Sequence, residues 1–171
     1  MSKCKNVLVN INKYDKELIL KCEKLIKKYY IKDKHAVITG ILDSDNKMFF
    51  GLSQGSPSGV SICGEPCALS QATLKSKTGK FKTIVSLRGK LEPPLVIPPC
   101  GICRELLRYH YPNINVIVMD ESSEKHQLKK IKSKYLLPYP YYKIRKQERN
   151  AYVKDTWCAR GHYDDNFNPD K

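Results

Sequence analysis

The sequence has no long hydrophobic run. No stretch approaches the roughly 18 apolar residues that a membrane-spanning helix needs. The N-terminal MSKCKNVLVN also lacks the apolar segment of a secretory signal peptide. Internal repeats and low-complexity blocks are absent as well. We therefore expect a soluble, cytoplasmic protein with no membrane partner, and its 171 residues are a typical length for one globular domain.

The number of cysteines is odd. The seven lie at positions 4, 22, 63, 67, 100, 103 and 158. An odd count without a secretion signal argues against a disulfide framework. In a reducing compartment, closely spaced cysteines are more often metal ligands or catalytic groups. The clustered cysteines near positions 63 and 100 are therefore candidates for such chemistry.

Acidic residues are scarce beside basic ones. The chain carries 17 of the former and 31 of the latter, a net charge of +14. Most of the excess lies on the flanks, because residues 1–34 and 121–171 carry +6 and +5 whereas residues 35–120 carry only +3. The flanks are either solvated helix faces and tails or an anion-binding surface.

Hydrophobic spacing predicts alternating helices and strands. Helices are expected near residues 14–30, 63–77 and 101–110, with one more allowed at 126–136; strands are expected at 35–42, 48–52, 81–87 and 113–120. This order favours one layered α/β domain with some parallel pairing in a mixed central sheet. We assign residues 1–142 to that domain and residues 143–171 to a charged C-terminal extension.

Two short motifs carry the chemistry. The first is Cys63-Gly64-Glu65, and the second is PCGICRE at residues 99–105. Each lies where a loop is expected to become a helix, and the positive end of a helix favours the thiolate form of cysteine. Cys100 and Cys103 are three residues apart, so a helix places them on one face, where they can bind one ion.

Cys63, Cys100 and Cys103 together form the predicted ligand set for Zn²⁺. Three thiolates leave the fourth position of tetrahedral zinc open for water, which is typical of a catalytic site. Glu65 lies two residues past Cys63 and could move protons without binding the metal. Arg104 is the candidate cation that would donate hydrogen bonds to the thiolates and offset their negative charge.

Other interpretations of these residues stay open. Cys67 could be a fourth ligand, which would give a structural zinc site without activity, or a small buried helix residue. A redox role for Cys100 and Cys103 would leave Cys63 and Glu65 unexplained. The four histidines, at positions 35, 110, 126 and 162, are candidate ligands by residue type alone. The tyrosines at 135, 139, 141 and 142 could stack on a base or simply pack against the domain.

The paired motifs resemble those of the cytidine deaminases and the related blasticidin S deaminases, over about residues 35–142. SICGE resembles their C-A-E box, PPCGICRELL their P-C-G-x-C-R-Q box, and KYLLPYPYY their late L-L-P segment. The resemblance implies a three-layer α/β/α cytidine deaminase-like fold, bound zinc and usually a homotetramer. It also implies hydrolytic replacement of a pyrimidine 4-amino group by oxygen, with release of ammonia. Glu65 would protonate the ring nitrogen and then help the amine leave.

The sequence departs from this family ahead of the first zinc cysteine. Cytidine deaminases carry an N-x-E pair there that binds ribose, whereas this chain reads GLSQGSPSG. Ser53 or Gln54 stands near the asparagine position, and the glutamate is missing. A neutral site can still hydrogen-bond a substrate, so Ser53 and Gln54 are the candidate substrate-binding residues. The box also reads C-G-E-P in place of C-A-E-R, and Glu105 replaces the usual glutamine.

These features predict a small nucleoside-like substrate, such as cytidine, deoxycytidine or blasticidin S. Two alternatives remain: a cytosine deaminase acting on RNA or DNA, and a non-enzymatic zinc protein. The basic flanks favour a nucleic-acid substrate. The middle of the chain has no stripe of interleaved aromatic and basic residues, which counts against it.

Overall fold

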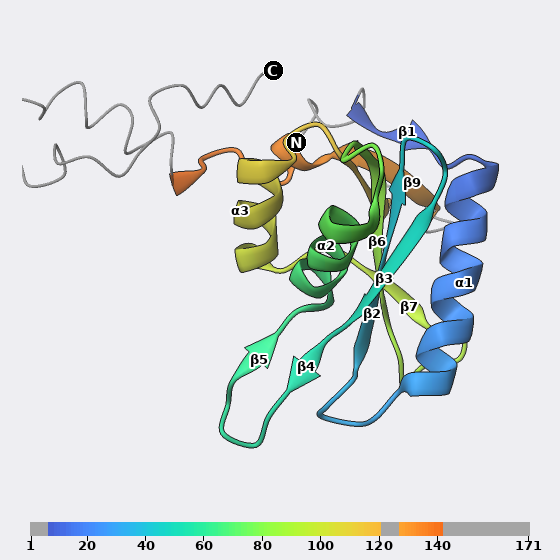
Figure 1. Cartoon of the computed structure of the whole chain (residues 1–171), viewed down its shortest axis with the longest axis vertical. Helices are drawn as coiled ribbons and strands as arrows, with labels where there is room; N and C mark the ends of the chain where they lie inside the picture. The colour runs from blue at the N-terminus through green and yellow to red at the C-terminus, as the bar shows by residue number, and fades with distance from the viewer. Residues whose placement is uncertain (1–6, 121–126, 142–171) are drawn as a thin grey trace, which may run out of the picture.

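A computed structural model describes residues 7–120 and 127–141 of the chain (Figure 1). Its elements in chain order are β1 (Val9–Asn10), α1 (Lys13–Tyr29), β2 (Val37–Asp43), β3 (Met48–Leu52), β4 (Gln54–Gly55), β5 (Ser61–Ile62), α2 (Gly64–Lys75), β6 (Phe81–Arg88), β7 (Leu95–Ile97), α3 (Gly101–His110), β8 (Asn115–Met119), β9 (Leu128–Lys132) and a 3-10 helix (Ser133–Tyr135). No helix within these ranges is long and apolar enough to cross a membrane.

One mixed sheet forms the middle layer. Its strands lie in the order β1-β9-β8-β6-β2-β3, and β7 pairs with the end of β6. The pairing of β6 with β8 is parallel, and the other pairs of this sheet are antiparallel. Helix α1 covers one face, whereas α2 and α3 cover the other (Figure 1). The predicted three-layer α/β/α fold with a mixed sheet is confirmed.

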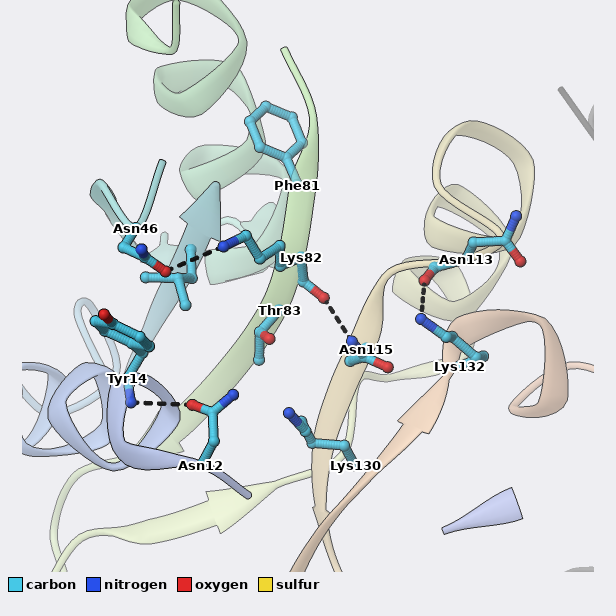
Figure 2. A pocket seen from close by; sticks show the side chains of 11 residues that line it. Asn12, Tyr14, Asn46, Phe81, Lys82, Thr83, Asn113, Asn115, Lys130 and Lys132 are labelled. Carbon is cyan, nitrogen blue, oxygen red and sulfur yellow. Dashed lines mark hydrogen bonds between the residues drawn. The ribbon is translucent and has the colours of Figure 1, made fainter. Parts of the chain in front are cut away.

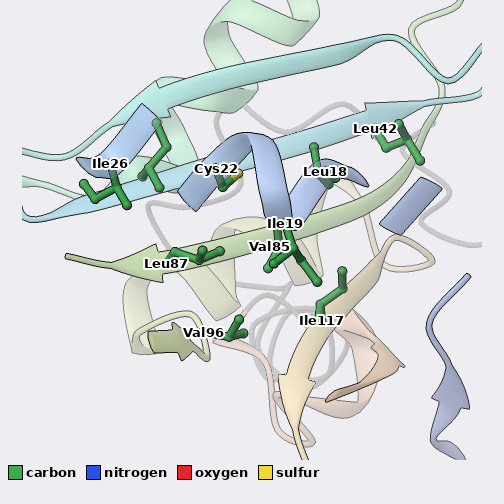
Figure 3. Close-up of a cluster of buried hydrophobic side chains, with 10 residues drawn as sticks. Leu18, Ile19, Cys22, Ile26, Leu42, Val85, Leu87, Val96 and Ile117 are labelled. Atoms are coloured by element: carbon green, nitrogen blue, oxygen red, sulfur yellow. The ribbon is translucent and has the colours of Figure 1, made fainter. Parts of the chain in front are cut away.

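Two hydrophobic clusters hold the layers together, because successive strand residues point to opposite faces of the sheet. Leu18, Cys22 and Ile26 of α1 pack against one set of strand residues (Figure 3): Ile38, Leu42, Val85, Leu87, Val96 and Ile117. Helices α2 and α3 pack on the other face against Ile41, Phe49, Ile84, Val116 and Ile131. Burial of Cys22 in the first cluster raises the pKa of its thiol.

Backbone packing fixes the position of α2. A Cβ atom at Gly51 of β3 would collide with the backbone of Cys67 and Ala68, so strand and helix backbones lie directly against each other. At Gly64, a Cβ atom would lie 2.6 Å from the Thr39 hydroxyl oxygen. These close approaches determine where the first turn of α2 lies.

The helix allowed at residues 126–136 is wrong, because the chain forms β9 and a 3-10 helix there. Strand β9 faces α1 with Leu128 and Lys130, and Ile131 points to the other core. Lys130 thus lies on a buried face of β9. An apolar residue at this position would have given the alternating pattern by which a strand is predicted. The segment 53–59, whose many serine, glycine and proline residues are typical of a loop, includes β4 of a short antiparallel β4–β5 ribbon.

The buried lysine is compensated by a carboxylate of α1. Lys130 Nζ lies 2.7 Å from Asp15 Oδ2, and their side chains are 9% and 0% exposed. The same oxygen accepts the backbone N–H of Asn12, and the Asn12 side chain accepts the N–H groups of Tyr14 and Asp15. Asp15 therefore closes a capping box at the start of α1 and also ties that helix to β9.

Loss of the lysine should destabilise the fold strongly. We expect Lys130→Ala to lower the free energy of unfolding by about 3–5 kcal/mol, because it leaves a buried charge unpaired. Urea unfolding followed by circular dichroism measures this. Lys21→Ala, which breaks the exposed pair with Glu17, is the control and should have a much smaller effect. Equal losses would contradict the role assigned to the buried pair.

Candidate metal and catalytic site

Three cysteine sulfurs converge where α2 and α3 begin. Cys63 is the N-cap residue of α2, Cys100 is the N-cap residue of α3, and Cys103 lies one turn further along α3. The Sγ atoms of Cys63 and Cys100 are 3.5 Å apart, and all three sulfurs lie within 4.8 Å of one another. The structure therefore brings together the three predicted metal ligands from two separate motifs.

The spacing of these sulfurs fits a single tetrahedral ion. With a Zn–S distance of about 2.3 Å, tetrahedral geometry separates two sulfurs by about 3.8 Å. The cluster meets this requirement with small side-chain adjustments. Its burial also fits a bound ion, since Cys103 is buried, Cys63 is half-buried and Cys100 is exposed, so one side stays open.

The acid–base properties of the cluster indicate that it needs a cation. Burial raises the pKa of Cys103, and the charges of Glu65 and Cys63 raise it further. Burial and the hydrogen bond with Cys100 likewise raise the pKa of Cys63, opposite to the expected effect of its helix end. Burial alone would raise the pKa of Cys100, but the backbone N–H of Cys103 and the neighbouring thiols lower it overall. Three thiolates beside a carboxylate repel one another unless a positive ion lies among them.

Glu65 lies beside the cluster without belonging to it. The residue is 4% exposed and lies in the first turn of α2. The Cys103 thiol donates to Glu65 Oε2 over 3.4 Å. A small void beside Glu65 is lined by Ser86 and by apolar side chains that include Leu107. A carboxylate held at the wall of an open three-ligand site can reach a reacting group there, as a proton shuttle must.

Three alternative ligands lie outside the sulfur cluster in the described structure. Cys67 is half-buried on α2 and is not part of the three-sulfur group. The Nδ1 atom of His35 lies 3.0 Å from the carbonyl oxygen of Ser53, and His110 packs edge-on against Tyr109. His126 and His162 lie outside the described residues, as does the extension predicted at 143–171. Within residues 7–120 and 127–141, the cluster has three metal-binding side chains and no fourth.

Arg104 contacts the backbone that carries Cys100. Its Nε donates to the Pro99 carbonyl oxygen over 2.8 Å, directly before that cysteine. Its backbone N–H also donates to the Cys100 carbonyl oxygen in the first turn of α3. The side chain thereby braces the turn that presents Cys100, and its contact with the thiolates stays a prediction.

The two candidate substrate-binding residues lie on the strand that leads from β3. The Ser53 hydroxyl oxygen accepts the backbone N–H groups of Ala36 and Val37, at 3.2 and 3.0 Å. Gln54 is exposed in β4, and its amide donates to the Leu52 carbonyl oxygen over 3.3 Å. Ser53 therefore fixes the start of β2, while the Gln54 side chain faces solvent.

A buried polar pair under α2 was not predicted from the sequence. The hydroxyl oxygens of Thr39 and Ser86 lie 2.7 Å apart, and Thr39 also lies against Gly64. Hydroxyl side chains on two strands cannot be paired from the sequence, because β2 and β6 are far apart along the chain. A further contact joins the last described residues to α3, since Glu105 accepts the backbone N–H of Tyr141.

The tyrosines of the last described segment remain at the surface. Tyr135, Tyr139 and Tyr141 are 51%, 83% and 57% exposed, and the ammonium of Lys134 lies over the ring of Tyr135. Packing against the domain therefore does not bury these three rings. Tyr142 lies outside the described residues. Stacking of the tyrosines on a base stays a prediction.

Comparisons with known proteins support the resemblance drawn from the two motifs. No protein-family model matches the chain. The sequence is 28% identical to the Blasticidin-S deaminase of Bacillus cereus over 115 residues, which cover 64% of this chain and 81% of that protein. The cytidine deaminase of Bacillus anthracis superposes with a TM-score of 0.60 at 21% identity, over 80% of this chain and 95% of that one. The Burkholderia pseudomallei cytidine deaminase gives 0.57 at 23% identity, over 74% and 98%.

The solved structures define the fold of the chain. Its fold is that of the cytidine deaminases, because solved members superpose over nearly their whole length. The resemblance to the cytidine and blasticidin S deaminases is confirmed by the curated relative and by these structures.

Substitution of single cysteines should distinguish the metal ligands from Cys67, their neighbour on α2. We expect Cys103→Ser to lose most of its bound metal on dialysis against a chelator, because a serine hydroxyl is a poor ligand for a thiophilic ion. Cys67→Ser should keep a single ion per chain. Metal content is measured by plasma mass spectrometry, and circular dichroism checks that both variants fold. Loss of metal from Cys67→Ser would make Cys67 a fourth ligand and the site a structural one.

Proposed function

We propose that this chain is a zinc-dependent aminohydrolase that deaminates a cytosine-containing nucleoside or nucleoside analogue. The observation that carries the proposal is the open three-sulfur cluster with the buried Glu65 carboxylate beside it. A structural zinc site would need four protein ligands, and the described residues bring only three together. The relationship to a blasticidin S deaminase supports the same reaction class.

The reaction would divide its work between the cysteines and Glu65. Zinc held by Cys63, Cys100 and Cys103 would lower the pKa of a water molecule and so supply hydroxide near neutral pH. Glu65 would carry a proton to the ring nitrogen of the pyrimidine, which makes the carbon bearing the amino group more electrophilic. It would then protonate the leaving amine, so that water and the substrate give the 4-oxo product and ammonia. Its burial keeps the carboxylate fixed beside the reacting atoms.

The substrate side of the site favours a ligand bound through neutral groups. The chain has no acidic residue between Asn46 and Glu65, so no carboxylate from this segment is available to a ribose. The exposed Gln54 amide could exchange its bond to the Leu52 carbonyl for one to a ligand, and the Ser53 hydroxyl, which accepts two backbone N–H groups, could still donate its hydrogen. We propose both as substrate-binding residues, and blasticidin S as the first compound to test.

The assembly forms part of the same proposal. Ile102, between two of the metal-binding cysteines, is 82% exposed, and Val60 and Ile62 beside the site are 63% and 47% exposed. Apolar side chains grouped near an active site are typical of a covered surface. We propose that neighbouring copies cover these side chains in a homotetramer, and that the protein is cytoplasmic. Sedimentation equilibrium on the purified chain measures the assembly.

Turnover should depend on the Glu65 carboxylate. Ultraviolet absorbance is followed as blasticidin S, cytidine and deoxycytidine are each mixed with the zinc-loaded protein. We expect Glu65→Gln to slow turnover by about 10²–10⁴-fold while the metal is retained, because the proton shuttle is lost. Glu105→Gln is the matched control: it makes the same chemical change on α3, away from the cluster, and should keep most activity.

The absence of turnover with all three compounds would overturn the nucleoside proposal. Single-stranded RNA and DNA are then the next substrates. Turnover that survives in Glu65→Gln would remove the role assigned to this carboxylate. Metal retained with no turnover of any substrate would leave a structural zinc protein.

Arg104 should act through the position and charge of the cysteines. We expect Arg104→Gln to lower kcat with limited loss of zinc, because the Pro99 carbonyl loses its partner and the thiolates lose a nearby cation. Arg104→Lys, which keeps the charge but not the planar donor group, should be intermediate. Metal analysis beside the kinetics separates the two effects. An unchanged kcat in both variants would contradict this role.

A further inference from the structure

A second cavity lies at the end of the sheet opposite the cysteines. Its volume is about 470 Å³, and it is formed where the start of α1 meets the first residues of β6 and β8 and the turn after β2. Cys63 and Cys100 begin α2 and α3, whereas the cavity residues of β6 and β8 follow the ends of these helices. Since the 12 residues of α2 span about 18 Å, the two sites are separate.

The lining of the cavity is basic and rich in amides. Three lysines and four asparagines contribute to it, together with Thr83 and the rings of Tyr14 and Phe81, and none of the described lining residues is acidic. Figure 2 shows Asn12, Thr83, Asn115 and Lys130 around the same space. Such a surface offers many hydrogen-bond donors and positive charge in a concave setting.

Two of the three lysines have no compensating charge. Lys130 is neutralised by Asp15, as described above. The Lys82 amine instead donates to Asn46 Oδ1 over 3.1 Å, and the Lys132 amine to the Asn113 carbonyl oxygen over 2.8 Å. Among residues 7–120 and 127–141, neither Lys82 nor Lys132 forms an ion pair. Both partners are neutral, so the cavity keeps an excess of positive charge.

This excess of positive charge is unfavourable in the protein without a ligand. Burial lowers the pKa of Lys132, and repulsion from Lys130 and Lys134 lowers it further. The fold thus holds like charges close together on β9 and its continuation without an anion between them. Groups perturbed in this way inside a cavity are typical of binding sites.

We propose that the cavity binds the phosphate group of a small phosphorylated compound, attracted by the positive charge of Lys82 and Lys132 in its wall, with the asparagine amides as neutral donors. Lysine ammonium groups are common phosphate ligands. The volume exceeds that of a phosphate ion, and the ring of Tyr14 can contact a sugar or base attached to it, which favours a mononucleotide. A concave site of this size suits a small molecule better than a polymer. The proposal does not depend on the deaminase function.

Nuclear magnetic resonance of the full, zinc-loaded chain tests this site directly. Inorganic phosphate and cytidine monophosphate are titrated into the ¹⁵N-labelled protein, with cytidine as the uncharged control. We expect saturable shifts at the backbone amides of Lys82, Thr83 and Asn115 with both phosphates, and none there with cytidine. Tighter binding of the monophosphate would identify a nucleotide as the ligand, and equal binding would identify the phosphate group alone.

Matched variants distinguish the cavity from general basicity. The double variant Lys82→Gln/Lys132→Gln should raise the Kd for phosphate at least about tenfold. Lys129→Gln, on the same strand but bonded to Asn10 and outside the lining, should leave the Kd unchanged. Glutamine at 132 can still donate to the Asn113 carbonyl, and it removes a repelled charge. The double variant should therefore be no less stable than the wild type in a thermal melt without phosphate.

Three results would overturn the proposal. One is the absence of saturable shifts at these amides with either phosphate. Another is an equal weakening by Lys129→Gln, which would mean that the basic surface attracts anions without a site. The third is binding confined to a single-stranded oligonucleotide, with neither small phosphate bound, which would assign the lysines to a nucleic-acid surface.

Discussion

The close contact between α2 and β3 is the constraint on which the candidate active site depends. Gly51 lets the backbone of the strand lie against the backbone of Cys67 and Ala68, and Gly64 leaves room for the Thr39 hydroxyl. Metal–ligand distances tolerate only about 0.2 Å of error. The cysteines can therefore meet only if the two helices that carry them begin in fixed places. The geometry of the sulfur cluster is a property of the backbone packing as much as of the cysteines themselves.

A buried ion pair performs the corresponding task on the other face. Asp15 caps α1 and binds Lys130, so one carboxylate sets both the start of the helix and its position on β9. Charges removed from water are costly, and such a pair stabilises a fold only when its hydrogen bonds are well made. Here the pair joins the first turn of the helix to β9, while the rest of α1 packs over β2 and β6. It also leaves a lysine at the wall of the basic cavity, where hydrophobic packing alone would have left none.

The sequence was sufficient where signals are local, and insufficient where they depend on distant partners. Helix α3 has the bounds expected from residues 101–110, because its cysteine motif and Pro112 mark both ends. The three ligands could be predicted together because each motif reports its own chemistry. Strand β9 could not, because its buried lysine is explained only by an aspartate far earlier in the chain. The Thr39–Ser86 pair and the basic cavity likewise arise from segments that only the folded chain brings together.

The distribution of charge between the two sites bears on what each can bind. A divalent ion among three thiolates would leave a net negative charge, and Glu65 lies against the same cluster. A phosphate group near these residues would meet repulsion in a partly buried place, where screening by salt is weak. At the other end of the sheet, Lys82 and Lys132 present positive charge with no acidic neighbour in the lining. These charges fit the proposed uncharged or cationic nucleoside at the cysteines and the proposed phosphate ligand at the opposite end of the sheet.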